Sequence, residues 1–264
     1  MELTMQMTRR KFVTLAAGGI AATAWGGGAE PASSQSQFKA IAFDAFAIFD
    51  PRPVFQLAEA IFPNRGAELS NVWRTRQFEY QWLRTISGHY SDFWHATDDA
   101  LVFAARQLKL DLTGEDRARL MQSLAELSAW PDTFPALRVL RKKGPQLALL
   151  SNMTGNMLKT GIVKNDLAGF FDQVFSTDQL KTYKPAPGAY QMAATAFGLR
   201  KEEILYVAFA GWDVAGAKWF GYPTYWLNRL NAAVEELGAL PDATGSDLND
   251  LVYFLSAGDH AARR

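Results

Sequence analysis

Hydrophobic residues along the chain gather in short continuous runs, separated by longer segments with a single apolar face. The first clear run lies within residues 38–50, FKAIAFDAFAIFD, where positions 40–43 are apolar without alternation. Such a run is typical of a strand covered on both faces in a parallel α/β sheet. Further apolar runs at 146–150, 173–176, 204–209 and 223–227 predict four more strands, and we expect the last of these to be the final strand of the chain.

The segments between these later runs have the features of helices. We expect helices at residues 134–142, 153–162, 187–197 and 214–220, and Gly144, Gly198 and Gly221 follow three of them as favoured stop signals. Strands that alternate with helices of about ten residues are typical of βαβ units. The pattern therefore predicts an α/β fold with a Rossmann-like parallel sheet core.

The stretch from residue 54 to about 129 has a helical pattern without a convincing strand. We expect helices at 67–86, 92–108 and 113–127, the last opened by a Thr113 cap. On the first of these helices Arg74, Phe78 and Gln81 are spaced i, i+4 and i+7, so a cation and an aromatic ring share one face. This predicts an all-α helical cap at residues 53–129, inserted after the first strand of a core formed by residues 38–52 and 130–264.

The first 29 residues have the features of a targeting segment rather than of a fold. Arg9 and Arg10 precede Phe12, a mildly apolar stretch spans 13–25, and small residues end at Ala29. This resembles a twin-arginine export signal with possible cleavage after Ala29, which predicts a periplasmic protein. An overpredicted start codon or a disordered basic tail are the alternatives. Residues 30–37, EPASSQSQ, are predicted to be a polar linker.

Composition narrows the class of protein. A chain of 264 residues, 48% hydrophobic and without an apolar run of eighteen residues, suits one or two domains with a substantial core and predicts no transmembrane helix. The 27 basic and 27 acidic residues balance, and without residues 1–29 there are 24 and 26, so neither nucleic acid nor a membrane is indicated as a partner. The absence of cysteine excludes disulfides, thiolate metal sites and a cysteine nucleophile. His89, His95 and His260 lack metal-ligand spacing, and we expect neither a metal ion nor a cofactor.

Candidate chemistry lies where the predicted strands end. Asp44 follows the first strand, and the carboxyl end of a strand is where open α/β sheets bind ligands, so Asp44 is our candidate nucleophile. An aspartate in this position can also be only a turn former or a helix cap. Other polar residues follow the later strands, namely Ser151 and Asn152, Lys184 in TYKPAPGAY, and Asp213 in AGWD. Taken singly, Ser151 and Asn152 could be a turn or a helix cap, and Lys184 could be an exposed loop lysine.

These segments together resemble the haloacid dehalogenase superfamily, and within it the type II 2-haloacid dehalogenases. The supporting segments are WRTRQFEYQWLR, LALLSN, YKPAPGAY and WDVAGAKWFGYPTYWLNR, and the match covers residues 38 to about 255. The resemblance implies the core-and-cap fold and hydrolysis of a short 2-haloalkanoic acid to a 2-hydroxy acid without a metal ion. It also implies a homodimer that associates through the cap helices.

The same resemblance implies roles for individual residues. Asp44 would displace halide to form an aspartyl ester, and Lys184 would offset the repulsion between this carboxylate and that of the substrate. Asp213 would orient Lys184 or help to position water. The remaining residues would bind the substrate. Ser151 would hold its carboxylate, and Arg74 and Asn152 would receive the halide. Its apolar part would contact Phe78, Phe93 and Trp212, and Tyr190 would hydrogen-bond into the site.

The chain departs from the family pattern at polar positions. Where the family usually has Asp-x-Tyr-Gly-Thr-Leu, Asp44 is followed by an apolar segment that includes Phe46 and Ile48, and where it has Ser-x-Asn-x-Trp-Asp, this chain has Ala208 and Ala210. Each lost polar contact can cost about 3 kcal/mol of transition-state stabilisation, so we expect a slow enzyme or one with a different, bulkier substrate. Two alternatives stay open. One is a non-catalytic, vestigial carboxylate-binding protein, and the other is a Mg²⁺-dependent phosphatase, which typically has a second aspartate at the position of Phe46.

Overall fold

The structure, a computed structural model, describes residues 38–261, and side chains up to residue 257. The predicted export signal and linker therefore lie outside the described residues. Within the described part of the chain, no helix is long and apolar enough to span a membrane.

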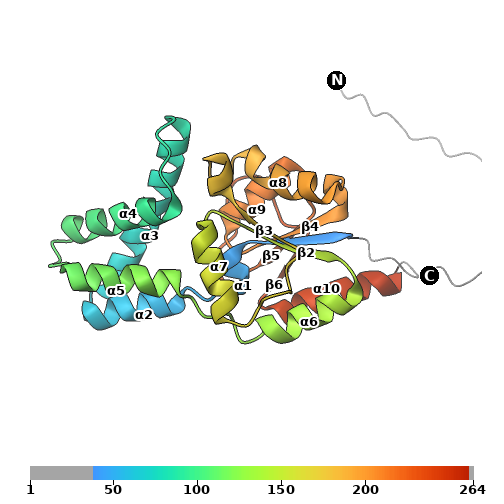
Figure 1. Cartoon of the computed structure of the whole chain (residues 1–264), viewed down its shortest axis with the longest axis horizontal. Helices are drawn as coiled ribbons and strands as arrows, with labels where there is room; N and C mark the ends of the chain where they lie inside the picture. Colours follow the sequence, from blue (N-terminus) through green and yellow to red (C-terminus); the bar gives the residue numbers. More distant parts are fainter. Residues whose placement is uncertain (1–37, 262–264) are drawn as a thin grey trace, which may run out of the picture. The chain divides into compact units, whose positions relative to one another are not determined.

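The described residues form a parallel sheet with the strand order β3-β2-β1-β4-β5-β6 (Figure 1). The strands are β1 (Ala40–Phe43), β2 (Gln146–Ser151), β3 (Gln173–Ser176), β4 (Ile204–Ala208), β5 (Thr224–Leu227) and β6 (Ala243–Gly245). All four residues of β1 are buried, as expected for a strand covered on both faces. The predicted α/β fold with a parallel sheet is confirmed, and β1 lies in the middle of the sheet between β2 and β4.

The expectation that residues 223–227 form the final strand is wrong, because β6 pairs with β5 at the edge of the sheet. Its three residues, Ala243, Thr244 and Gly245, are partly or fully exposed and do not form an apolar run. An edge strand this short lacks the hydrophobic pattern by which the other strands are predicted. The following helix α10 (Leu248–Ala261) was not predicted either.

Helices cover both faces of the sheet. Figure 1 shows α8 (Pro187–Phe197) and α9 (Gly211–Phe220) on one face, and α6 (Thr133–Lys143) and α10 on the other, with α7 (Gly155–Lys164) following β2. The residues of β1 alternate between two apolar clusters, because Ile41 and Phe43 belong to one and Ala40 and Ala42 to the other. The small side chains of the second cluster allow Tyr190 of α8 to pack close to the sheet.

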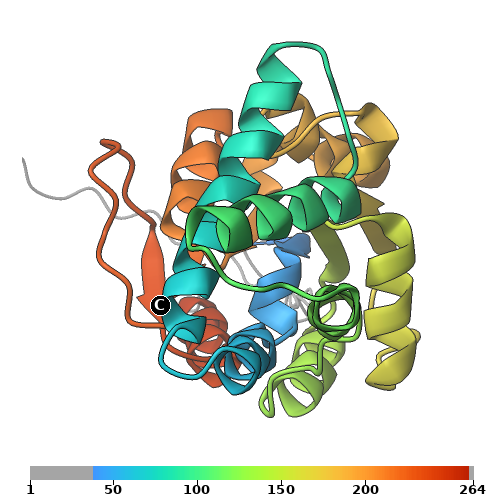
Figure 2. The same ribbon diagram turned by 90° about the vertical axis from the view of Figure 1, so that its left-hand side faces the viewer.

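The stretch between β1 and α6 is helical, with α1 (Ala45–Ile48), α2 (Arg52–Ile61), α3 (Gly66–Ile86), α4 (Phe93–Gln107) and α5 (Gly114–Ala125). Figure 2, viewed from their side, shows α2 to α5 in front of the sheet and its helices. Thr113 caps α5 as predicted, because its side chain accepts a hydrogen bond from Asp116 N. The two connections to these helices are paired by a bridge between Phe49 and Ala129. The domain boundaries themselves stay a prediction.

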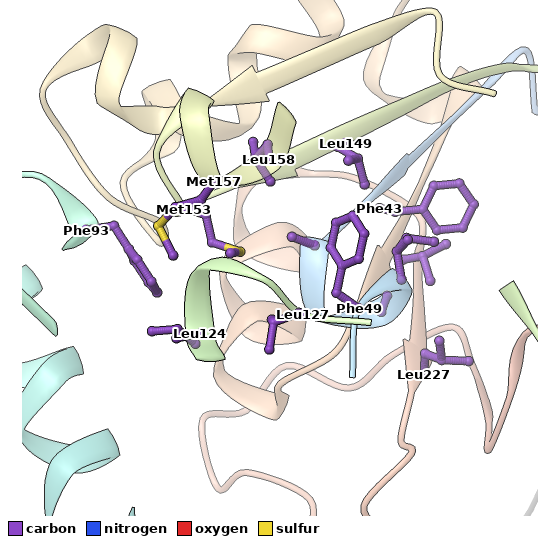
Figure 3. Close-up of a cluster of buried hydrophobic side chains, with 14 of the residues drawn as sticks. Phe43, Phe49, Phe93, Leu124, Leu127, Leu149, Met153, Met157, Leu158 and Leu227 are labelled. Atoms are coloured by element: carbon purple, nitrogen blue, oxygen red, sulfur yellow. The ribbon is translucent and has the colours of Figure 1, made fainter. Parts of the chain in front are cut away.

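One apolar cluster joins the cap helices to the sheet. Phe93 of α4 and Leu124 of α5 belong to the same buried cluster as Met153 and Met157 (Figure 3). Phe49 packs there against α7, where a Cβ on Gly161 would lie 2.9 Å from its ring. The glycine therefore permits this close approach, and the connection that leaves the Asp44 turn is fixed against α7.

Candidate active site

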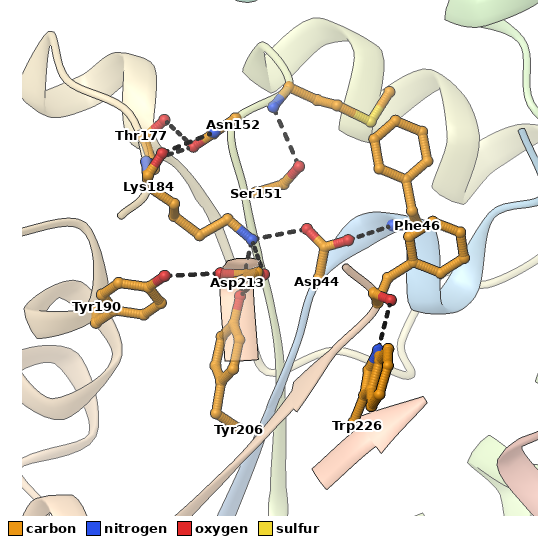
Figure 4. Close-up of polar contacts among 12 residues, drawn as sticks. Asp44, Phe46, Ser151, Asn152, Thr177, Lys184, Tyr190, Tyr206, Asp213 and Trp226 are labelled. Carbon is orange, nitrogen blue, oxygen red and sulfur yellow. Dashed lines mark hydrogen bonds and ion pairs between the residues drawn. The ribbon is translucent and has the colours of Figure 1, made fainter. Parts of the chain in front are cut away.

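The ends of β1 and β4 and the loop before α8 bring three charged side chains into contact. Lys184 Nζ lies 2.7 Å from Asp44 Oδ1 and 2.7 Å from Asp213 Oδ2 (Figure 4). Asp44 directly follows β1, and Asp213 lies in the first turn of α9 after β4, which is the neighbour of β1. All three residues are buried. Parallel strands that end at one edge of the sheet thus place two carboxylates around one ammonium group.

Asp44 is also the N-cap of α1. Its Oδ2 accepts a hydrogen bond from Phe46 N at 3.0 Å, and its own backbone N–H donates to Val207 O at 2.9 Å. The helix-cap role is therefore real, and it is compatible with a chemical role because it fixes the side chain by its second oxygen. The carboxylate keeps lone pairs on both oxygens that no described residue uses.

Tyr206 and Tyr190 complete the polar network around Lys184. Tyr206 Oη accepts the third hydrogen bond of the ammonium group at 2.7 Å and donates to Asp213 Oδ2 at 2.8 Å. Tyr190 Oη donates to Asp213 Oδ1 at 2.7 Å. A Cβ at position 216 would lie 2.3 Å from Tyr190 Oη, so Gly216 makes room for this contact.

Sequence reasoning missed Tyr206, because in the apolar strand ILYVA it has the appearance of a core aromatic residue. A hydroxyl group on a fully buried strand is nonetheless a signal, since it needs a hydrogen-bond partner in the interior.

Burial and charge set the protonation states of this network. Burial raises the pKa of the Asp44 carboxyl, although the Lys184 ammonium opposes the shift. Burial lowers the pKa of Lys184, but the carboxylates of Asp213 and Asp44 outweigh burial, and its net pKa is raised. Burial and the charge of Asp213 hold the pKa of Tyr190 and of Tyr206 well above the ordinary value. Lys184 is therefore a cation at neutral pH, and both phenols remain hydrogen-bond donors.

Asn152 fixes the backbone that carries Lys184. Its Oδ1 accepts hydrogen bonds from Lys184 N at 2.8 Å and from Thr177 Oγ1 at 3.2 Å. Its Nδ2 donates to Gln81 Oε1 of α3 at 3.2 Å and to Lys184 O at 3.5 Å. Since both N–H groups are engaged, we assign Asn152 to holding this loop against the cap, and its predicted halide contact stays a prediction.

The network forms the polar wall of a cavity of about 460 Å³. The predicted site residues that line it are Asp44, Arg74, Phe78, Phe93, Ser151, Asn152, Lys184, Trp212 and Asp213. Tyr190 is the one predicted site residue that is not part of the lining, and it lies behind Asp213. Arg74 is exposed at this cavity and forms no hydrogen bond or ion pair with any other described residue. A free guanidinium group and a buried carboxylate therefore border the same space.

The lining beyond these groups is mostly aromatic. Phe78 lies 5.2 Å from Trp212 and Trp82 lies 5.7 Å from it, between ring centroids. Phe46 and Phe209 lie 5.9 Å apart. Within the part of the chain whose side chains are described, no group of three or more histidine, aspartate or glutamate residues is arranged to hold a metal ion.

The arrangement suits covalent catalysis. A carboxylate held by a cation and a backbone amide, at the wall of a mostly apolar cavity, is suited to attack a ligand that binds there. Fold and site are thus compatible with an α/β enzyme that uses an aspartate as its nucleophile.

Comparison with known proteins agrees with this class. Residues 14–221 match the model of the haloacid dehalogenase-like hydrolase family. The chain is 37% identical over 221 residues to haloacetate dehalogenase H-2 of Moraxella sp. strain B, which covers 83% of this chain and 99% of that protein. A crystal structure of an L-2-haloacid dehalogenase is 42% identical with a TM-score of 0.81, over 83% of this chain and 99% of the other. A structure of the Xanthobacter autotrophicus L-2-haloacid dehalogenase with chloropropionic acid covalently bound is 30% identical with a TM-score of 0.76, over 83% and 98%.

The chain therefore belongs to the haloacid dehalogenase-like hydrolase family, and the resemblance predicted from the sequence is confirmed. Two of the four positions that depart from the family pattern lie at this site. Phe46 and Ala210 line the cavity, and Ile48 and Ala208 are fully buried. None of these four side chains offers a hydrogen bond to a ligand or to water.

Proposed function

We propose that the protein hydrolyses the carbon–halogen bond of a 2-haloalkanoic acid through an ester on Asp44. The observation that carries the proposal is the contact of Asp44 with Lys184 at the wall of an apolar cavity that also holds the free cation Arg74. The names of the relatives, and the covalently bound chloropropionic acid in one of them, support this chemistry.

In the first step an oxygen of Asp44 attacks C2 of the substrate. The new C–O bond forms as the C–X bond breaks, the electron pair leaves with the halide, and the configuration at C2 is inverted. Ser151 Oγ accepts a hydrogen bond from Met153 N at 3.1 Å, which leaves its own proton available for the substrate carboxylate. Arg74 has no competing anion among the described residues and would receive the halide.

In the second step water attacks the Cγ carbon of the Asp44 ester. The bond between Cγ and the ester oxygen breaks, and the 2-hydroxy acid leaves with this former Asp44 oxygen, which takes up one proton of the water. The oxygen of the water stays on the restored carboxylate, and the second proton is released to solvent. Asp213 already accepts hydrogen bonds from Lys184, Tyr190 and Tyr206, so both of its oxygens are engaged in holding this network. We therefore assign it to orienting Lys184, and we expect ester hydrolysis to be the slower step.

The direct test is incubation with 2-chloropropionate or 2-bromopropionate, followed by measurement of free halide, of 2-hydroxypropionate and of the protein mass. We expect product, or a mass increase on Asp44 if the ester accumulates. Asp44→Asn should abolish both. The same substitution at the exposed residue Asp111 is the matched control and should change neither. Folded protein that yields no halide and no adduct would contradict the proposal and favour a carboxylate-binding protein.

We also propose that residues 1–29 direct export to the periplasm. The paired arginines Arg9 and Arg10 and the mildly apolar stretch after them support this. The test is the distribution of the full chain between periplasm and cytoplasm. Replacing both arginines by lysine should retain it in the cytoplasm, and an unchanged distribution would count against twin-arginine export.

A further inference from the structure

The cavity is larger than a short haloacid requires. 2-Chloropropionate has six non-hydrogen atoms, and even at the volume of liquid water, about 30 Å³ for each, it would occupy roughly 180 Å³. The cavity measures about 460 Å³, which lies in the range of pockets that enclose drug-sized ligands. More than half of its space would stay unused by such a substrate.

The walls of this unused space are aromatic. Eight aromatic side chains line the cavity, and they come from both the cap and the core: Phe46, Phe55, Trp73, Phe78, Trp82, Phe93, Phe209 and Trp212. Around Trp212 the rings of Phe78 and Trp82 form edge-on contacts at 5.2 and 5.7 Å. Such walls offer ring faces and edges to a further aromatic group at ordinary stacking distances.

The positions nearest to the nucleophile contribute to this character. Phe46 follows Asp44 by two residues, and its ring lies 5.9 Å from that of Phe209 at the end of β4. Ala210, which follows Phe209 in the chain, has only a methyl side chain. Although it is the N-cap of α9, it makes no side-chain hydrogen bond. Among the polar residues of the lining, Asp44, Lys184 and Asp213 form one closed network, while Arg74, Ser151 and the buried Ser70 Oγ, which has no hydrogen-bond partner among the described residues, can contact a ligand. The other polar residues of the lining are Thr75, Gln77, Glu79, Thr97, Asn152, Asn228 and Glu235, and most of the lining surface is apolar.

We propose that the substrate is a 2-halo acid with a large apolar, aromatic substituent on C2, such as a 2-halo-2-arylacetic acid. The inference rests on the proposed function, and the same bonds form and break: Asp44 displaces halide from C2, and water releases the 2-aryl-2-hydroxy acid. The carboxylate needs only the polar groups beside Asp44, while the ring occupies the aromatic part of the cavity.

The test compares kcat/KM for 2-chloro-2-phenylacetate and for 2-chloropropionate. We expect the wild-type protein to favour the phenyl compound at least tenfold. Ala210→Leu narrows the cavity and should lower this ratio at least tenfold. Ala60→Leu, the same change at an exposed position of α2 that does not line the cavity, should leave the ratio as it is. A wild-type ratio at or below one would overturn the inference.

A binding measurement separates this inference from the proposed function. Calorimetry with phenylacetate and propionate, which carry no halogen, reports the ligand preference without any chemistry. Phenylacetate binding at least tenfold tighter, with no halide from either chloro acid, would uphold the ligand class while the proposed function fails. Halide from 2-chloropropionate together with equal or weaker phenylacetate binding would overturn the inference while the proposed function stands.

Discussion

The phenol oxygen of Tyr206 lies 2.7 Å from Lys184 Nζ and donates in turn to Asp213. Tyr206 and Ala208 are two residues apart on β4 and so face the same side of the sheet, where the family pattern usually has a serine at the position of Ala208. A hydroxyl group is thus present beside Lys184, but it comes from an earlier position of the strand and a longer side chain. We infer that Tyr206 positions the lysine that orients Asp44.

Tyr206→Phe should lower kcat/KM tenfold to a hundredfold. The substitution removes a buried hydroxyl group and leaves Lys184 and Asp213 each without one hydrogen bond, which costs about 1–3 kcal/mol. Single-turnover rates and the thermal midpoint are measured together. Adding Ala208→Ser should restore part of the rate, which a purely structural role of Tyr206 would not predict. A rate within twofold of wild type would contradict the positioning role.

Lys184→Met should lower the free energy of unfolding by about 3–5 kcal/mol at pH 7, because it leaves Asp44 and Asp213 buried and without their cation. The pKa of the buried Asp44 carboxyl in the folded variant then lies further above its value in the unfolded chain, because the opposing charge of Lys184 is gone. The folded state binds more protons, so stability should rise as pH falls through this folded pKa. Urea unfolding of the wild type and of Lys184→Met at pH 5 and pH 8 measures this. A loss of unfolding free energy in the variant that is larger at pH 5 than at pH 8 would contradict the prediction.

The pH dependence of wild-type alkylation should report the raised pKa of Asp44. Burial raises this pKa, and only the ionised carboxylate attacks, so the rate should fall on the acid side at a pH above about 4, the ordinary aspartate value. Rates of adduct formation between pH 3.5 and 8 are the measurement. A half-maximal rate at or below pH 4 would show that Lys184 outweighs burial.

Arg229 is a second positioning residue that sequence reasoning missed. Its guanidinium group donates to Ala47 O at 3.0 Å and to Asp132 at 2.9 and 3.0 Å, and lies 4.5 Å from the Trp130 ring. It thereby ties the turn after Asp44 to the connection that leaves the cap.

Arg229→Lys should reduce kcat about tenfold with a smaller change in KM, because a lysine cannot donate simultaneously to Ala47 O and to both oxygens of Asp132 in the geometry of a guanidinium group. Steady-state kinetics measure both parameters. The same change at Arg200, which is 76% exposed in its side chain, should have no effect. Equal kcat and KM values for the two variants would contradict a positioning role for Arg229.

Part of this arrangement could be predicted from the sequence. Apolar runs identify β1, β2 and β4, and polar residues at their ends identify Asp44, Ser151 and Asp213 as candidates that meet at one edge. The edge strand β6 lacks an apolar run and could not be identified in this way. In the sequence Tyr206 resembles a core residue, because its partner Lys184 lies 22 residues earlier and only the fold brings the two side chains together. Asn152 was identified, but its engagement with Gln81 and the Lys184 backbone depends on how cap and core meet.

Isotope transfer in a single turnover tests most directly whether Asp44 forms and then loses an ester. With enzyme in excess over 2-chloropropionate in H₂¹⁸O, we expect the first hydroxy acid to carry ¹⁶O from Asp44, and peptide mass spectrometry to find ¹⁸O in the Asp44 carboxyl group. Incorporation of ¹⁸O directly into the hydroxyl group of the first product, with Asp44 unlabelled, would contradict the covalent mechanism.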